Sequence, residues 1–268
     1  MSDRYPLQGM RKRYDPVGSC IYCGASAVPL TDEHIIPRGI YGGLVLPRAS
    51  CLDCNSITSA RESRYQNGTI KDLRTALEMP NTDGQRISRP IRIRSDKGDE
   101  AKHHLQDAPS FIFSPILPLP EVLGGSSWLE TAIQFQMVVV NPSSARKLQT
   151  QHGNFKSTPI SFNVIDFSLM IAKIAHSFAT AELSPILAAQ AEFVLPDLIR
   201  GISTITPDAF VGGAPQSLGE RPAELHQIEL QKWQVEDRHY IVVRLSLFAF
   251  WRTPPFLIVA AKLGAQRG

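Results

Sequence analysis

Four cysteines most strongly constrain the fold of this 268-residue chain, and they form two Cys-x-x-Cys pairs, Cys20/Cys23 and Cys51/Cys54. One tight turn brings two thiolates to one ion, and two such turns complete a tetrahedral site. The charged N-terminus lacks the apolar segment of a secretory signal, so we expect a cytoplasmic protein with metal-binding thiols. The sequence therefore predicts a structural Zn²⁺ site. Adventitious disulfides or a redox Cys-x-x-Cys are the alternatives, and two matched pairs argue against the redox motif.

The segment between the two pairs is 27 residues long, whereas an ordinary zinc ribbon has roughly 15–20 residues there. The extra length leaves room for a β-hairpin, and "VPLTDEHIIPRGIYGGLVLP" predicts one with Gly42-Gly43 near its turn. After the second pair, "CNSITSARESRYQ" and "TIKDLRTALEM" predict a helical run that Pro80 ends.

The order and spacing of these segments resemble the HNH endonuclease family, in which a ββα-metal unit cuts phosphodiester bonds. The family pattern is C-x-x-C, an acid before His-Ile-x-Pro, a Gly-Gly turn, and C-x-x-C-Asn at the start of a helix. This chain has Cys20-Ile-Tyr-Cys23, Glu33-His34-Ile-Ile-Pro37, Gly42-Gly43 and Cys51-Leu-Asp-Cys54-Asn55. The resemblance covers about residues 18–63, under a fifth of the chain.

The resemblance implies a role for each matching residue. His34 matches the general base that takes a proton from the attacking water, a role that suits a side chain with a pKa near neutrality. Glu33 and Asn55 match the ligands of a catalytic divalent ion, Mg²⁺ or Mn²⁺, which would offset charge at the scissile phosphate of DNA. The structural zinc and the catalytic metal would then be separate sites.

The sequence departs from the family pattern in two places. The family has a central Asn that braces the loop bearing the His, but the corresponding place here lies near Leu46. The acid before the His is Glu33 rather than Asp, and Asp32 could serve instead. Glu62 lies two helical turns after Asn55 on the same face, where it could ligate the metal or pair with an arginine.

The seven histidines differ in the context that the sequence gives them. A single histidine is more often packed or solvated than catalytic, but the motif around His34 favours function. We expect His103 and His104 to be solvated and His176, on an apolar helix, to be structural.

The basic residues lie unevenly along the chain: residues 1–102 hold 16 Lys and Arg against 12 Asp and Glu, while the remainder holds 12 against 13. This surplus permits phosphate binding. The candidate contacts are Arg38, Arg48, Arg61, Arg64, Arg92 and Arg94. The last two would face one side of an extended strand, although a solvated linker explains them equally well.

The remaining sequence predicts an α+β fold. We expect a basic arm (1–15), a zinc-stabilised ββα-metal module of HNH type (16–80), a linker with one short strand at "RPIRIRS" (81–125) and a C-terminal α+β domain of unknown type (126–268). In that domain "DFSLMIAKIAHSFATAEL" predicts a helix, "YIVVRLSLFAFW" and "PFLIVAAKL" predict buried strands, and "SWLETAIQFQMVVVNP" fits either. No apolar run is long enough to predict a membrane span.

The sequence therefore favours a metal-dependent DNA endonuclease or nickase. By analogy, small bacterial proteins that join such a module to an unfamiliar domain often belong to defence or mobile-element systems. The first alternative is a zinc-binding nucleic-acid or protein-interaction module without catalysis. The second is a nuclease subunit of a larger complex that is active only with a protein partner. The C-terminal domain could contact such a partner or a second copy of the chain.

Overall fold

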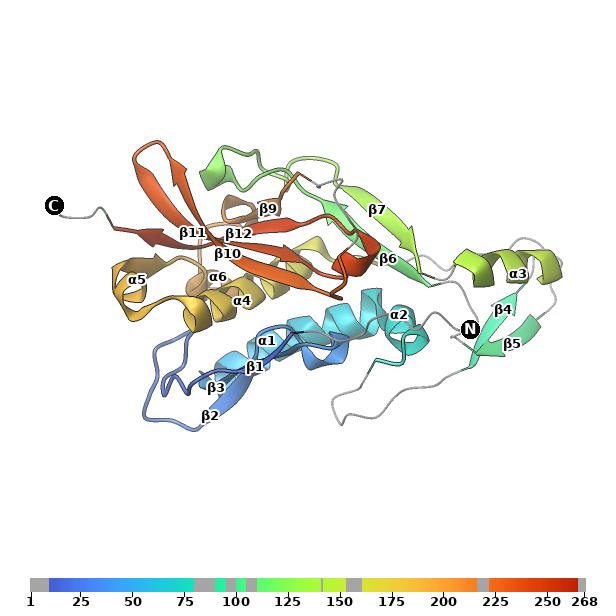
Figure 1. Ribbon diagram of the computed structural model, residues 1–268, viewed down its shortest axis with the longest axis horizontal. Coiled ribbons are helices and arrows are strands. Elements are labelled where there is room, and N and C mark those ends of the chain that lie inside the picture. Colours follow the sequence, from blue (N-terminus) through green and yellow to red (C-terminus); the bar gives the residue numbers. More distant parts are fainter. Residues whose placement is uncertain are drawn as a thin grey trace.

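The computed structural model describes residues 10–79, 90–94, 100–104, 110–140, 142–152, 161–215 and 222–264. These residues form a mixed α+β fold. In Figure 1 the N-terminal strands and helices lie along one side of a long helix, and the C-terminal sheet lies along the other. This layering determines which C-terminal side chains reach the segment from Cys20 to Asn55.

The N-terminal part is a three-stranded sheet followed by a helix. Strands β2 (Leu30–His34) and β3 (Gly43–Cys51) pair antiparallel, and β1 (Arg11–Arg13) pairs parallel with β3. A short 3₁₀ helix (Arg38–Ile40) lies in the connection between β2 and β3. The predicted hairpin is confirmed, and its second strand begins at the predicted Gly-Gly pair.

The predicted helical run is also confirmed, although it is not one regular helix. Helix α1 (Leu52–Arg64) begins directly after β3, a π-helical turn follows (Tyr65–Thr69), and α2 (Lys71–Ala76) completes the run. Gly68 lies within the π-helical turn, where its low helix propensity weakens the regular ladder. Pro80 lies outside the described residues.

Helix α4 (Val164–Glu182) is the central element, between α1 and the C-terminal sheet (Figure 1). Every residue from Phe167 to Ala179 is buried, because neighbours cover the helix on more than one side. Asn163 caps it by accepting a hydrogen bond from the Asp166 backbone N–H. By length and composition alone α4 could cross a membrane, but 72% of its most apolar 18-residue window is buried inside the protein, as in a core helix.

The C-terminal sheet contains β10 (Gln227–Val235), β11 (Arg238–Ser246), β12 (Phe256–Leu263) and β8 (Ala191–Phe193), in that order, and β9 (Val211–Gly213) also pairs with β12. All these pairings are antiparallel. Strands β11 and β12 confirm the two predicted buried strands, and the 3₁₀ helix between them (Ala249–Trp251) is also mostly buried. Short helices α5 (Pro185–Gln190) and α6 (Pro196–Arg200) follow α4.

Two hairpins and a helix complete the described fold. Strands β4 (Pro90–Arg94) and β5 (Glu100–His104) pair antiparallel, as do β6 (Phe111–Ile116) and β7 (Gln134–Val139), and α3 (Pro142–His152) follows. Strand β4 confirms the strand predicted at "RPIRIRS". Strand β7 lies in "SWLETAIQFQMVVVNP", the segment whose pattern fitted either a helix or a strand. Short 3₁₀ helices lie at Glu121–Leu123 and Pro207–Ala209. The proposed domain boundaries remain predictions.

Candidate functional site

The four cysteines converge at the junction of the N-terminal sheet and α1. The Sγ atoms of Cys20, Cys23, Cys51 and Cys54 all lie within 4.8 Å of one another, and those of Cys23 and Cys51 are 3.7 Å apart. In a tetrahedral Zn²⁺ site with Zn–S bonds near 2.3 Å, thiolate sulfurs are separated by about 3.8 Å. A disulfide needs about 2.05 Å. This group could therefore hold a structural metal ion such as zinc.

The thiols are arranged for shared ligation. Burial raises the pKa of the Cys20 thiol, but hydrogen bonds from the Cys51, Tyr22 and Cys23 backbone outweigh it and lower that pKa to about 7. At Cys54, burial and the neighbouring cysteines raise the pKa instead. Thiolates drawn together without a cation repel one another, and a bound metal ion would relieve that repulsion.

Strand β2 directs three consecutive acidic and basic side chains into different surroundings. Glu33 is 3% exposed, His34 is half-buried and Asp32 is exposed, where it accepts from the Arg13 guanidinium at 2.9 Å. The alternation follows from the two-residue period of a strand, with an irregularity between Thr31 and Glu33. Asp32, the alternative metal ligand, is thus on the outer surface.

A lysine from α4 occupies the centre of the Glu33 site. Its ammonium forms ion pairs with Oε1 of Glu33 and, at 2.8 Å, with Oε1 of Glu62. Lys173 also donates to the backbone carbonyl oxygen of His34, and that of Ile35 lies 3.4 Å away. The side chains of Lys173 and Glu33 are 3% and 4% exposed and that of Glu62 is 17% exposed, so the ammonium is buried in a polar cluster that solvent reaches in part at Glu62.

The charges in this cluster depend on one another. Burial alone would lower the pKa of Lys173, but Glu33 and Glu62 outweigh it and raise that pKa above its ordinary range. Burial raises the pKa of Glu33, although Lys173 opposes the rise. Because two carboxylates surround the ammonium, it stays protonated and holds both acids in place.

The imidazole of His34 is neutral at physiological pH. Burial, followed by the positive charges of Lys173 and Arg38, lowers its pKa to about 4. Its Nδ1 atom is buried and has no hydrogen-bond partner in the described part of the chain. A neutral imidazole with a free ring nitrogen has the protonation state that a proton acceptor requires.

The pairing of Glu33 and Asn55 as ligands of one catalytic ion stays a prediction. Asn55 is in the first turn of α1 and partly buried, and among the described residues no hydrogen bond or ion pair links its side chain to Glu33 or His34. Glu33 Oε2 is buried and has no hydrogen-bond partner among the described residues, whereas Oε1 is paired with Lys173. A divalent ion at Glu33 would lie beside the Lys173 ammonium in a buried site. The arrangement does not fit a Mg²⁺ or Mn²⁺ ion there.

The predicted DNA-contact residues fall into three groups. Arg64 donates twice to the Asp166 carboxylate at 2.7 Å, and Arg61 donates to the backbone oxygen of Ile199, so both are engaged with the C-terminal part. Arg38 and Arg48 are exposed. Arg92 and Arg94 lie on β4, two residues apart. Arg38 and Arg48 are thus better placed than Arg61 and Arg64 to contact DNA phosphates.

Two further histidines join the N-terminal and C-terminal parts. Nε2 of His176 lies 2.8 Å from the Ile21 carbonyl oxygen, and Nε2 of His226 lies 2.7 Å from that of Ile40. Burial lowers the pKa of each to about 4. The structural role predicted for His176 is confirmed. His103 and His104 lie on β5, and their predicted solvation remains a prediction.

Sequence reasoning missed Lys173, the residue that organises the site. The available signal was a single lysine in the apolar run "LMIAKIAHSF" of the predicted helix. A lysine there must bury its ammonium, which requires acidic partners elsewhere in the fold.

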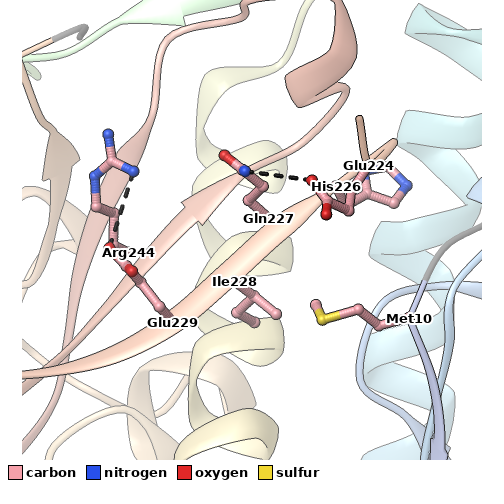
Figure 2. A pocket seen from close by; sticks show the side chains of 7 residues that line it. All are labelled: Met10, Glu224, His226, Gln227, Ile228, Glu229 and Arg244. Atoms are coloured by element: carbon pink, nitrogen blue, oxygen red, sulfur yellow. Dashed lines mark hydrogen bonds and ion pairs between the residues drawn. The ribbon is translucent and has the colours of Figure 1, made fainter. Parts of the chain in front are cut away.

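A separate cavity of about 410 Å³ lies on the C-terminal sheet, lined by Met10, Glu224, His226, Gln227, Ile228, Glu229 and Arg244. Figure 2 shows these side chains around the N-terminal end of β10. Its charged groups are partly engaged, since Arg244 lies 3.9 Å from Glu229. No residue of the Lys173 cluster lines it, so it is distinct from the His34 site.

Comparison of the chain with models of protein families, with curated proteins and with solved structures finds no match. The geometry defines an α+β protein with a four-cysteine group able to hold a structural metal ion.

Proposed function

We propose that the protein is an HNH-type endonuclease that hydrolyses phosphodiester bonds of DNA with His34 as its general base. The observation that carries the proposal is the half-buried, neutral His34 at the end of β2, in a strand–strand–helix unit whose helix begins at the four-cysteine group. The quoted sequence motifs support the same assignment.

In this proposal His34 accepts a proton from the attacking water. Its pKa of about 4 keeps the imidazole neutral at pH 7 and so able to accept a proton, but it also makes His34 a weaker base than an ordinary histidine. Exposed Arg38, in the 3₁₀ helix between β2 and β3, and exposed Arg48, on β3, would contact backbone phosphates without reading base sequence.

The resemblance also calls for a catalytic Mg²⁺ or Mn²⁺, for which Asn55 is the available ligand on α1. The ion pair between Glu33 and Lys173 argues against Glu33 as its partner. We therefore assign no step of the reaction to an ion at Glu33.

A second candidate is a zinc-stabilised nucleic-acid or protein-interaction module without catalysis. Two observations favour it: Lys173 engages Glu33, and Leu46, the residue opposite Glu33 on β3, stands where the family has a bracing Asn. The third candidate, a nuclease active only with a partner protein, predicts a silent purified chain that cuts once the partner is added.

The test is cleavage of supercoiled plasmid by the purified zinc-loaded chain with Mg²⁺ or Mn²⁺, with EDTA added in a parallel reaction. The matched variants are His34→Ala and His239→Ala, since His239 is exposed on β11. The proposal predicts nicking or linearisation that persists in His239→Ala and is lost in His34→Ala. Cutting that survives in His34→Ala would overturn the role of His34. Equal DNA binding without cutting would support the non-catalytic module.

A further inference from the structure

The surroundings of the Lys173 ammonium are those of a bound cation. Its nearest acceptors are carboxylate oxygens of Glu33 and Glu62 and the backbone carbonyl oxygens of His34 and Ile35. Carboxylate and carbonyl oxygens are also the ligands that hard divalent cations take from proteins. This set comes from β2, the segment after it, and α1, and the cation comes from a third element, α4.

We infer that Lys173 is the resident cation of the Glu33–Glu62 pocket and the positioning residue of His34. Its ammonium lies beside the Glu33 carboxylate, where a divalent ion bound by Glu33 would lie. It also fixes the β2 backbone by donating a hydrogen bond to the His34 carbonyl oxygen. The inference rests on the proposed function only for the role of His34. The occupancy of the pocket by Lys173 is independent of any cleavage.

Helix α4 cannot withdraw this cation by a small movement. The residues on both sides of Lys173, Ala172 and Ile174, are fully buried, as are Ile171 and Ala175. Moving the helix would expose the centre of the core that joins the two parts of the protein. Lys173 is therefore a permanent component of the pocket, present whether or not a metal ion is added.

Lys173 also supplies a contact that β3 does not. Leu46 is paired with Glu33 in the β2–β3 register, and an aliphatic side chain offers no hydrogen bond to the β2 backbone. The ammonium reaches the same stretch from α4, through the carbonyl groups of His34 and Ile35. The Ile35 backbone N–H is held separately, by the Leu44 carbonyl oxygen at 3.0 Å. Together these bonds fix the end of β2 where the imidazole projects.

The first test is Mn²⁺ binding to the zinc-loaded chain, measured by electron paramagnetic resonance without nucleic acid. We expect wild type and Glu33→Gln to bind Mn²⁺ alike, because no ion uses Glu33. We expect Lys173→Met to gain one Mn²⁺ site at least tenfold tighter than any in wild type, and the Lys173→Met/Glu33→Gln double variant to lose it again. Lys262→Met, at an exposed position on β12, is the matched control and should gain no site.

A wild-type Mn²⁺ site that Glu33→Gln removes would overturn the inference, because Glu33 would then be a metal ligand despite Lys173. This comparison changes no lysine, so it remains decisive even where Lys173→Met fails to fold. If the wild-type chain showed no His34-dependent cleavage, only the proposed function would fail. The Mn²⁺ measurement would still test the inference, because it involves no reaction.

The second test is amide hydrogen exchange at Ile35 and Ile36. Lys173→Arg keeps a cation in the pocket and should leave exchange within about threefold of wild type. Lys173→Met should raise exchange there at least tenfold more than at β11 amides, which report the loss of global stability, as a local loss of anchoring requires. Unchanged exchange at Ile35 and Ile36 in a folded Lys173→Met chain would refute the positioning role.

Discussion

Replacing Lys173 with methionine should remove the charge of the buried cluster while keeping most of its packing, because methionine is close in length to the aliphatic stem of lysine. Glu33 is then left as a carboxylate in a site where its side chain is 4% exposed. Breaking a buried ion pair by removing one partner typically costs about 3–5 kcal/mol. That loss is a large share of the roughly 5–15 kcal/mol that stabilises a typical domain.

A double-mutant cycle separates the electrostatic cost from the packing cost. Glu33→Gln in the Lys173→Met background removes the unpaired charge, so the double variant should recover about 1–3 kcal/mol of the free energy of unfolding. The assay is urea denaturation followed by circular dichroism at fixed zinc concentration, because metal binding alters apparent stability. Lys262→Met, exposed on β12, should change stability by less than about 0.5 kcal/mol.

The cost of Lys173→Met should also depend on pH. Burial already raises the pKa of Glu33 above its ordinary value of 4.5, and removing Lys173 removes the charge that opposes this rise. A raised carboxyl pKa means that the folded state holds the proton more tightly, so the penalty accumulates as pH rises above 4.5. The stability gap to wild type should therefore narrow as pH falls from 7 towards 4.5. A pH-independent gap, or a double variant no more stable than Lys173→Met, would refute the reasoning.

Four further predictions follow from the structure. The purified chain should contain one zinc ion, measured by elemental analysis, and Cys54→Ser should lose both the zinc and the folded N-terminal part. Arg48 has φ 49°, so Arg48→Gly should raise stability by up to about 1 kcal/mol in urea denaturation. Burial lowers the pKa of His176 and His226 to about 4; their neutral forms stabilise the fold above pH 6.5, and wild type should lose up to about 3 kcal/mol per histidine as pH falls towards 4. Arg38→Glu should weaken DNA binding and flatten its salt dependence in fluorescence anisotropy.

The sequence sufficed for the features that depend on local patterns. The cysteine spacing predicted a four-cysteine group, the hairpin length and Gly42-Gly43 predicted β2 and β3, and the apolar periodicity around Ile171 predicted α4. These patterns are short-range or are repeated along one element, so their physical cause is visible in neighbouring residues.

The contacts of Glu33 could not be predicted from such local sequence patterns. The resemblance implied a metal ligand, whereas the structure pairs Glu33 with Lys173, 140 positions later in the sequence. Likewise Arg64 is on the predicted helix, but its pairing with Asp166 depends on how α4 packs against α1. Such contacts arise from tertiary packing, which no local propensity specifies.

The proposed role of His34 as the base of a phosphodiester hydrolase is tested most directly by the single-turnover rate of plasmid nicking, measured for wild type and His34→Ala at equal zinc content. The account predicts nicking by wild type and a loss of at least 100-fold in His34→Ala, in line with the roughly 10²–10⁴-fold contribution of a general base. Equal rates in the two proteins would contradict it.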